Sequence, residues 1–263
     1  MEKPYFAATD IAVLPSYFPI PGLGFLQCNA YVIKANEPVL VDTGLGIDCE
    51  EFMRALKSVI DPQDLKWILI THDDADHIGN FETVISAAPE ARIATNAVTV
   101  LRMSTWIQIP MDRVYCLNPG ESISVGDRKL TAFKPPFFDN PATIGFYDDK
   151  SEAVYSADFF GAILPSPVKN IDEVSEETLA QGMVLWGTVD SPWLHFTDQS
   201  KFRLRLDAMR KMAPKMIFSS HLPPAYGRTE QFLRSLASVP EAEPFTAPNQ
   251  AAFQQLLAEV HSI

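Results

Sequence analysis

The sequence predicts a mixed α/β protein in which two sheets pack against each other between outer layers of helices. Short apolar runs alternate with helical patterns between residues 29 and 117, whereas the region 129–156 is rich in strands. The run 67–70 is apolar throughout, as expected of a strand that is buried on both faces. Helices that alternate with such strands cover the faces of a sheet, which gives this layered α/β class.

The first half of the chain begins with a predicted β-hairpin. Residues 29–33 and 39–41 are apolar and flank a polar turn at 34–38. Asp48 with Glu51 three residues later is a helix N-terminal signal, and it predicts a helix over 48–60. The remaining predicted elements of this half are a strand at 67–70, a helix near 79–88, a strand at 91–95, a helix at 96–106 and a strand at 113–117.

The second half contains a second predicted hairpin, in which 142–147 and 153–156 flank a polar turn. We expect one domain over residues 1–263, with a core at about 25–230 and a helical tail at 240–263. The remaining predicted elements are a helix at 173–186, an amphipathic helix at 200–212, a strand at 216–219 and a last helix at 249–260.

The composition excludes two classes of partner. The 263 residues include 21 Lys and Arg against 33 Asp and Glu, a formal net charge of −12. Such a chain repels nucleic acid and anionic membrane surfaces. No window approaches the run of about 18 apolar residues that a membrane span needs. Three cysteines without a CxxC spacing fit a reducing compartment, so we expect a soluble cytoplasmic protein.

The most informative segment is Thr71-His72-Asp73-Asp74-Ala75-Asp76-His77, between a predicted buried strand and a predicted helix. A tight loop at a strand end brings His72, Asp74, Asp76 and His77 into one small volume. Imidazole nitrogens mixed with carboxylate oxygens suit a divalent transition metal. The alternative is an acidic surface turn that happens to hold two of the five histidines of the chain.

Two further strands end in residues that bind metals. Asp158 follows the predicted strand 153–156, and His221 follows the predicted strand 216–219. Each residue alone is typical of a cap or a solvated turn. Together with the first cluster they indicate one metal centre at the edge of a sheet.

These motifs resemble the metallo-β-lactamase fold superfamily over residues 25–230. His72-x-x-x-Asp76-His77, Asp158 and His221 occur in the order of that superfamily, and Asp42-Thr43-Gly44 matches its early strand-end motif. The resemblance implies an αββα sandwich with a dinuclear site at one edge, in which Asp158 bridges two metal ions. Asp42 is the residue expected to orient a ligand imidazole, since ligating histidines need such a partner.

The sequence departs from the superfamily pattern at two positions, and the first departure resembles the flavodiiron and oxygen-binding diiron branch. Hydrolases of the superfamily have His-x-His-x-Asp-His, whereas Asp74 stands at the second His, where that branch has a carboxylate. Asp139 begins a segment that resembles His-Thr-Pro-Gly-Ser-Ile-Gly and stands at its His. The resemblance implies that one metal takes His72, Asp74, Asp139 and Asp158, and the other Asp76, His77, Asp158 and His221.

A shell of three imidazoles and four carboxylates favours iron or manganese over zinc. We therefore expect two metal ions, with iron as the predicted metal and manganese or zinc as alternatives. Asp139 has a shorter side chain than histidine, so it either ligates directly or hydrogen-bonds a water at the metal.

The surroundings of the site leave two interpretations open. Phenylalanines near Asp139 and Asp158 either form an apolar pocket for a small diatomic molecule or belong to the core. His195 is either a proton donor that lines the pocket or a packed loop residue, and we favour the second; His261 is expected to be solvated. The phenylalanines are Phe137, Phe138, Phe146, Phe159 and Phe160.

The resemblance implies that the protein binds or reduces O2 or NO. Too few residues follow His221 for a flavodoxin-like domain, and no Gly-rich phosphate loop occurs. We therefore expect no FMN site, a separate electron-donor protein and a homodimer. The alternative function is metal-dependent hydrolysis of an ester, lactone or phosphoester by a metal-activated water. A binding protein with a decayed site is a third hypothesis.

Overall fold

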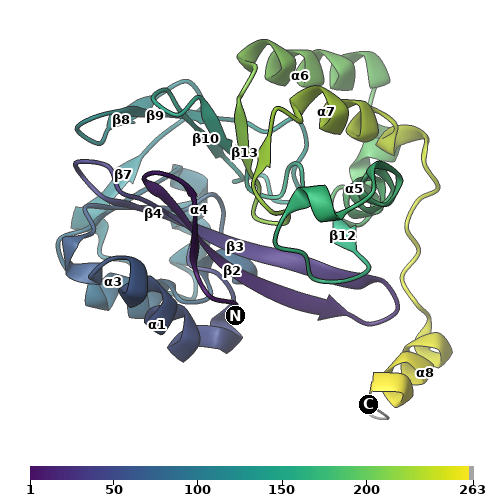
Figure 1. Ribbon diagram of the computed structural model, residues 1–263, viewed down its shortest axis with the longest axis horizontal. Coiled ribbons are helices and arrows are strands. Elements are labelled where there is room, and N and C mark those ends of the chain that lie inside the picture. Colours follow the sequence, from purple (N-terminus) through teal and green to yellow (C-terminus); the bar gives the residue numbers. More distant parts are fainter. Residues whose placement is uncertain (261–263) are drawn as a thin grey trace.

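The computed structural model describes residues 1–260, in which two β-sheets lie face to face between helices (Figure 1). Helices α6 (Gln199–Met212) and α7 (Thr229–Ala237) cover one outer side, and α1 (Cys49–Val59) and α3 (Phe81–Ala87) cover the other. The predicted αββα sandwich of two mixed sheets is confirmed.

The first sheet has the strand order β1-β2-β3-β4-β5-β6-β7, with β12 paired to β3. Its pairings are antiparallel from β1 to β4 and parallel from β4 to β7, because helices connect the later strands. The strands are β1 (Tyr5–Ala8), β2 (Ile11–Ile20), β3 (Gly24–Ile33), β4 (Val39–Val41), β5 (Trp67–Leu69), β6 (Arg92–Thr95), β7 (Val114–Cys116) and β12 (Ile163–Leu164).

The second sheet has the order β14-β13-β11-β10-β9-β8. All its pairings are antiparallel except that of β11 with β13, so the carboxyl ends of these two strands lie side by side. The strands are β8 (Ser122–Ser124), β9 (Lys129–Phe133), β10 (Gly145–Asp148), β11 (Ala153–Tyr155), β13 (Met216–Phe218) and β14 (Ala225–Tyr226).

The other helices complete the outer layers and the tail. They are α2 (Ala75–Ile78), α4 (Ala97–Met103), α5 (Glu176–Asp190) and α8 (Gln250–Val260). Short 3₁₀ turns connect the elements: η1 (Gly46–Asp48), η2 (Pro62–Asp64), η3 (Met111–Arg113), η4 (Ile171–Glu173), η5 (Pro192–Phe196) and η6 (Val239–Glu241).

Three apolar clusters hold the layers together. Phe52 and Leu56 of α1 belong to the cluster between the first sheet and its helices. Tyr31 and Phe218, whose rings lie 5.2 Å apart, belong to the cluster between the two sheets. A third cluster, which includes Phe232 of α7, lies between the second sheet and its helices. Burial of apolar side chains in three successive layers is the main force that fixes the sandwich.

Both predicted hairpins are confirmed, as β3–β4 and β10–β11. The expected helix near 79–88 corresponds to α3, and the short helix α2, which was not predicted, precedes it and ends before Gly79 and Asn80. Asp48 precedes α1, but its carboxylate caps no backbone N–H; it accepts a 2.7 Å hydrogen bond from the Ser16 hydroxyl instead.

The strand β2 was not predicted, because Pro15 and Pro19 argue against a strand. The register explains why the prolines are tolerated: β1 pairs with β2 only over Ile11–Val13. Beyond this point β2 is an edge strand, where a missing N–H donor removes no ladder hydrogen bond.

The tail ends in α8, which an extended segment connects to the body of the protein (Figure 1). The helix lies against the β2–β3 turn, since a Cβ atom at Gly22 would be 2.8 Å from Leu256 Cδ2. Residues 261–263, which include His261, lie outside the described residues. Within residues 1–260, none of the helices has both the length and the apolar character that a membrane span requires.

Candidate metal centre

Four strand ends position the centre. Asp42 follows β4, His72 follows β5 with two residues between, Asp158 follows β11 and His221 follows β13. Asp42 has a φ of 57° and Ala157, which precedes Asp158, has a φ of 53°. Left-handed backbone at non-glycine residues is uncommon, and it is typically retained at functional sites. These strand ends turn sharply so that their side chains meet at one edge of the sandwich.

Asp158 lies at the middle of three buried imidazoles. The Nε2 atoms of His77 and His221 both lie 2.9 Å from Asp158 Oδ1, and His72 Nε2 lies 3.2 Å from Asp158 Oδ2. The rings of His72 and His77 are 4.0 Å apart. One carboxylate that faces histidines with both its oxygens has the position required of a bridging ligand.

Several of these atoms lack a hydrogen-bond partner among the described residues. These buried atoms are His72 Nε2, His77 Nε2 and Asp158 Oδ2. The 2.9 Å contact of His77 with Asp158 does not have hydrogen-bond geometry. Because buried polar atoms are normally paired, three such atoms that face one another fit a metal ion between them.

The other nitrogen of each ring is held from behind. His77 Nδ1 lies 2.9 Å from Asp42 Oδ2, His221 Nδ1 lies 2.6 Å from the Gln27 carbonyl oxygen, and His72 Nδ1 lies 3.1 Å from Thr71 Oγ1. Donation of Nδ1–H to the Asp42 carboxylate and the Gln27 carbonyl leaves the Nε2 lone pairs of His77 and His221 facing Asp158. Asp42 thus lies in the orienting position that the sequence predicts for it.

The electrostatics of this group are strongly coupled. Burial acts against the charged form of Asp158, but His72, His77 and the hydrogen bond with His221 outweigh it and hold the pKa of Asp158 well below its usual value. Burial lowers the pKa of His72. Burial acts in the same direction on His77, but Asp76, Asp158 and Asp42 raise its pKa well above the ordinary value. The negative charges of these carboxylates therefore favour the binding of a cation at the centre.

Asp74 and Asp139 form the outer rim of the centre. Donor atoms of His72, Asp74 and Asp139 all lie within 4.8 Å of one another. Desolvation, the negative charge of Asp158 and the contact with Asp74 raise the pKa of Asp139 to about 9. Asn140 Nδ2 donates a 2.7 Å hydrogen bond to Asp74 and thereby fixes that carboxylate at the rim.

Asp76 lies on the opposite side of the centre. Its Oδ2 atom is 3.6 Å from His77 Nε2 and 3.5 Å from His221 Nε2. The structure thus brings together the residues that were expected to hold two metals. Asp73, the remaining acid of the motif, has a different partner, since both its oxygens lie 2.8 Å from Arg102 Nε.

Two residues at the centre were not predicted from the sequence. Donor atoms of Asp190, at the end of α5, lie within 4.8 Å of those of Asp139 and Asp158. The sulfur of Cys28, in β3, likewise lies within 4.8 Å of donor atoms of Asp76 and His221. Neither residue follows a strand end, which was the signal used to find the others, and only the packing of α5 and β3 brings them here.

Trp186 of α5 holds Asp158 and His221 from behind. Its Nε1 atom donates a 3.0 Å hydrogen bond to the Asp158 carbonyl oxygen, and its ring lies 4.7 Å from that of His221. Gly161 makes this contact possible, because a Cβ atom there would be 2.7 Å from Trp186 Nε1 and 2.8 Å from His221 Cβ.

The phenylalanines expected near the site belong mostly to the core. Phe137, Phe146, Phe159 and Phe160 have no exposed surface, and they belong to the clusters that pack the second sheet. Phe138 instead lies at the surface, where its ring is 5.5 Å from that of Trp193. The core interpretation therefore holds for four of the five.

His195 lies in η5, and its donor atoms belong to none of the ligand clusters found within residues 1–260. The ring is partly buried, and its Nε2 atom has no hydrogen-bond partner in the described part of the chain. This placement favours the packed-loop interpretation over a role at the metals.

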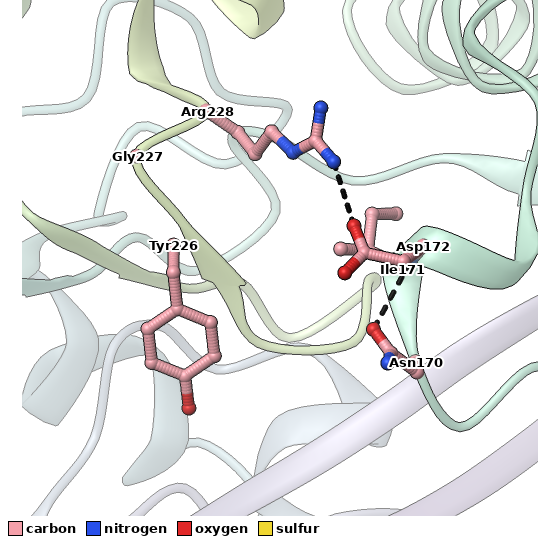
Figure 2. Close-up of a pocket in the computed structure, with 6 residues that line it drawn as sticks. All are labelled: Asn170, Ile171, Asp172, Tyr226, Gly227 and Arg228. Atoms are coloured by element: carbon pink, nitrogen blue, oxygen red, sulfur yellow. Dashed lines mark hydrogen bonds and ion pairs between the residues drawn. The ribbon is translucent and has the colours of Figure 1, made fainter.

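A surface pocket lies elsewhere on the molecule (Figure 2). It has a volume of about 310 Å³ and lies between η4 and the end of β14. Arg228 and Asp172 form an ion pair of 2.6 Å across it. The pocket shares no residue with the metal centre, so it does not bear on the chemistry there. Its lining residues are Asn170, Ile171, Asp172, Tyr226, Gly227 and Arg228.

A family model described as "ODP family beta lactamase" matches residues 26–221, a span that includes all seven predicted metal ligands. The chain belongs to this family. The ODP-family assignment confirms the resemblance to the metallo-β-lactamase fold.

Curated relatives of this ODP-family chain include flavodiiron proteins. It is 28% identical over 141 residues to a flavo-diiron protein of Clostridium acetobutylicum (53% of this chain, 35% of that protein). It is 26% identical over 146 residues to a nitric oxide reductase of Moorella thermoacetica (56% and 37%). It is 24% identical over 155 residues to a rubredoxin-oxygen oxidoreductase of Megalodesulfovibrio gigas (59% and 39%). The ODP-family chain thus matches less than two fifths of the length of each of these relatives.

Solved structures have the same fold as this ODP-family chain. The rubredoxin oxygen:oxidoreductase of Desulfovibrio gigas superposes with a TM-score of 0.78 at 18% identity, over 92% of this chain and 63% of the other. A fragment of a putative diflavin flavoprotein of Nostoc superposes with a TM-score of 0.75 at 14% identity, over 91% and 96%.

Proposed function

We propose that this protein holds a dinuclear iron centre that binds or reduces O2 or NO, with electrons supplied by a separate protein. The observation that carries the proposal is the donor set, in which four carboxylates and three imidazoles gather around the buried Asp158 in a fold shared with flavodiiron proteins. Such a donor set is the one expected for two cations of intermediate hardness.

We propose that Asp158 is the bridging ligand and that the other ligands divide between two positions. His72, Asp74 and Asp139 would hold one ion, and Asp76, His77 and His221 the other. The spacing of the donor atoms supports this division. His72, Asp74 and Asp139 lie within 4.8 Å of one another, whereas Asp76 Oδ2 lies 3.6 Å and 3.5 Å from the Nε2 atoms of His77 and His221.

Iron is favoured over zinc by the number of oxygen donors. Asp139 and Asp74 place carboxylates in the first position, where only His72 supplies nitrogen. Oxygen donors favour iron or manganese, whereas nitrogen-rich sites favour zinc. Four ligand carboxylates also balance the charge of two divalent ions. Stoichiometric zinc without iron in protein purified from its native host would contradict the iron assignment.

When bound, the ions supply the affinity for a gas molecule and the redox chemistry; the chain itself holds and encloses them. Asp42 and Gln27 fix the His77 and His221 rings through Nδ1. Trp186 covers the rear of the Asp158–His221 pair. Asp74 and Asp139 lie on the more exposed side, which leaves access for a small ligand at this rim.

The proposal is tested by anaerobic reconstitution with ferrous ion, followed by exposure to O2 or NO. We expect about two iron ions per chain, an optical change on exposure, and consumption of the gas when a reductant is present. The Asp158→Ala variant should lose these responses, and Asp64→Ala, which alters an exposed carboxylate on η2, should retain them. Hydrolysis of a generic ester or phosphodiester with neither an optical change nor gas consumption would refute the proposal in favour of hydrolysis.

We further propose that residues 1–263 form a single domain, that the protein is a homodimer and that it is cytoplasmic. The shared apolar cluster between the two sheets supports one domain. The cysteines of the described chain are all free, which fits a reducing compartment. Light scattering tests the dimer, and pulldown with the purified protein tests for a redox partner.

A further inference from the structure

Cys28 is a buried thiol at the side of the centre where Asp76 and His221 lie. It belongs to β3 and is 2% exposed. Its sulfur, an Asp76 carboxylate oxygen and a His221 ring nitrogen all lie within 4.8 Å of one another.

Metal–ligand bond lengths show what this spacing permits. A divalent metal of zinc-like size binds thiolate sulfur at about 2.3 Å and imidazole nitrogen or carboxylate oxygen at about 2.0–2.2 Å. Two donor atoms on one ion are therefore at most about 4.5 Å apart. Three donors on one ion cannot all lie opposite one another, so they are about 3–4 Å apart in pairs. Cys28, Asp76 and His221 reach this arrangement if each moves by less than about 1 Å.

A separate observation points to a ligand at the same place. His77 Nε2 is buried without a hydrogen-bond partner among the described residues and lies 3.6 Å from Asp76 Oδ2. Asp42 fixes the His77 ring from behind. Asp76, next to the unpartnered His77 nitrogen, belongs to the group that contains the Cys28 sulfur. Sulfur, nitrogen and oxygen donors thus meet at a buried point, which distinguishes this group from an acidic surface cluster.

We propose that the Cys28 thiolate is a ligand of the metal ion that Asp76, His77, Asp158 and His221 would hold. The proposal rests on the dinuclear centre proposed above. Formation of the metal–sulfur bond releases the thiol proton to solvent, and it transfers no electron.

Because a sulfur ligand would be present at just one of the two metal positions, the two positions would differ in their donor atoms. The position of Asp74 and Asp139 has hard oxygen donors, whereas the position of Cys28 has one soft donor. Soft thiolate selects zinc, copper(I) or iron over the hard cations, so metal preference should differ between the two positions.

The chain supplies two control cysteines. Cys116 is exposed on β7, and Cys49, at the start of α1, has its sulfur 3.4 Å from the Thr83 hydroxyl. Neither belongs to a group of potential ligands within residues 1–260.

The test is reconstitution of the metal-stripped full chain with Co²⁺, read by the thiolate-to-cobalt charge-transfer band in the near ultraviolet and by elemental analysis. The wild type and the double variant Cys49→Ser/Cys116→Ser, in which Cys28 is the remaining thiol, should bind two cobalt ions and show the band. Cys28→Ser and Cys28→Ala should lose the band and bind one of the two ions at least about 10-fold more weakly.

The outcomes separate this proposal from the dinuclear centre itself. Two bound cobalt ions without a band in the double variant would overturn ligation by Cys28 and leave the centre intact. Fewer than two bound ions in the wild type would overturn the dinuclear centre as well. The double variant retains Cys28, so the test holds even where a Cys28 variant does not fold.

Discussion

The Asp42→Asn substitution tests how the chain prepares a histidine for the metal. Asp42 is 1% exposed and accepts three contacts: two from Thr71, through N and Oγ1, each at 2.8 Å, and one from His77 Nδ1 at 2.9 Å. Asparagine has the same shape and tolerates the left-handed backbone of this position. The substitution therefore keeps the shape of the side chain, replaces one carboxylate oxygen by an NH2 donor and removes the negative charge.

The magnitude follows from which contacts survive. Oδ1 still accepts from Thr71 N, and the Thr71 hydroxyl rotates to accept from the new amide. The amide and His77 Nδ1–H would both be donors, so the imidazole would move its proton to Nε2, the atom that faces Asp158. Loss of such a supporting partner lowers metal affinity by about 10–100-fold, or about 1.4–2.7 kcal/mol.

The assay is competition for metal against a chelator of known affinity. Asp61→Asn is the matched control, because Asp61 also accepts a backbone hydrogen bond but lies on the exposed turn η2. We expect weaker binding for Asp42→Asn and no change for Asp61→Asn. Unchanged affinity in a folded Asp42→Asn protein would refute the role of Asp42 in orienting His77.

Three further predictions concern stability and metal uptake. The Arg128→Met variant leaves the Asp148 carboxylate without its 3.0 Å ion-pair partner, and neither side chain of this pair has exposed surface. Urea denaturation should show that the free energy of unfolding falls by about 3–5 kcal/mol. The control Lys215→Met, at an exposed ion pair, should lower it by less than about 1 kcal/mol. Metal affinity should rise with pH between about 6 and 9, because a metal ion held by Asp139 displaces its proton and the pKa of Asp139 is raised to about 9. Asp190, whose pKa burial and Asp158 raise to about 8, lies beside Asp139 and should also lose its proton when a cation binds there. Isothermal titration in buffers of different ionisation enthalpy counts the released protons, and a flat profile would contradict the prediction. The Gly161→Ala substitution should lower the free energy of unfolding by about 1–3 kcal/mol, because the new Cβ overlaps Trp186 and His221. In the control Gly120→Ala the new Cβ meets no neighbouring atom, so this variant measures the effect of a positive φ alone.

The sequence predicted the sheet layers well where apolar runs are short and bounded by polar turns. The hairpins β3–β4 and β10–β11 and the buried strand β5 follow from local patterns. The edge strand β2 does not follow from a local pattern. Its prolines lack an N–H and are tolerated only where no neighbouring strand accepts a hydrogen bond from that position, and strand pairing is a property of the folded sheet.

The sequence by itself determined most of the candidate metal centre, because His72, Asp158 and His221 each follow a short apolar strand and strand ends can be located from local composition. Only the tertiary structure decided which atoms meet. The parallel pairing of β11 with β13 places Asp158 beside His221, and the packing of β3 and α5 brings Cys28 and Asp190 to the same point. Local patterns encode where a strand or helix ends, whereas contacts between distant residues depend on how buried apolar faces pack, which no short segment specifies.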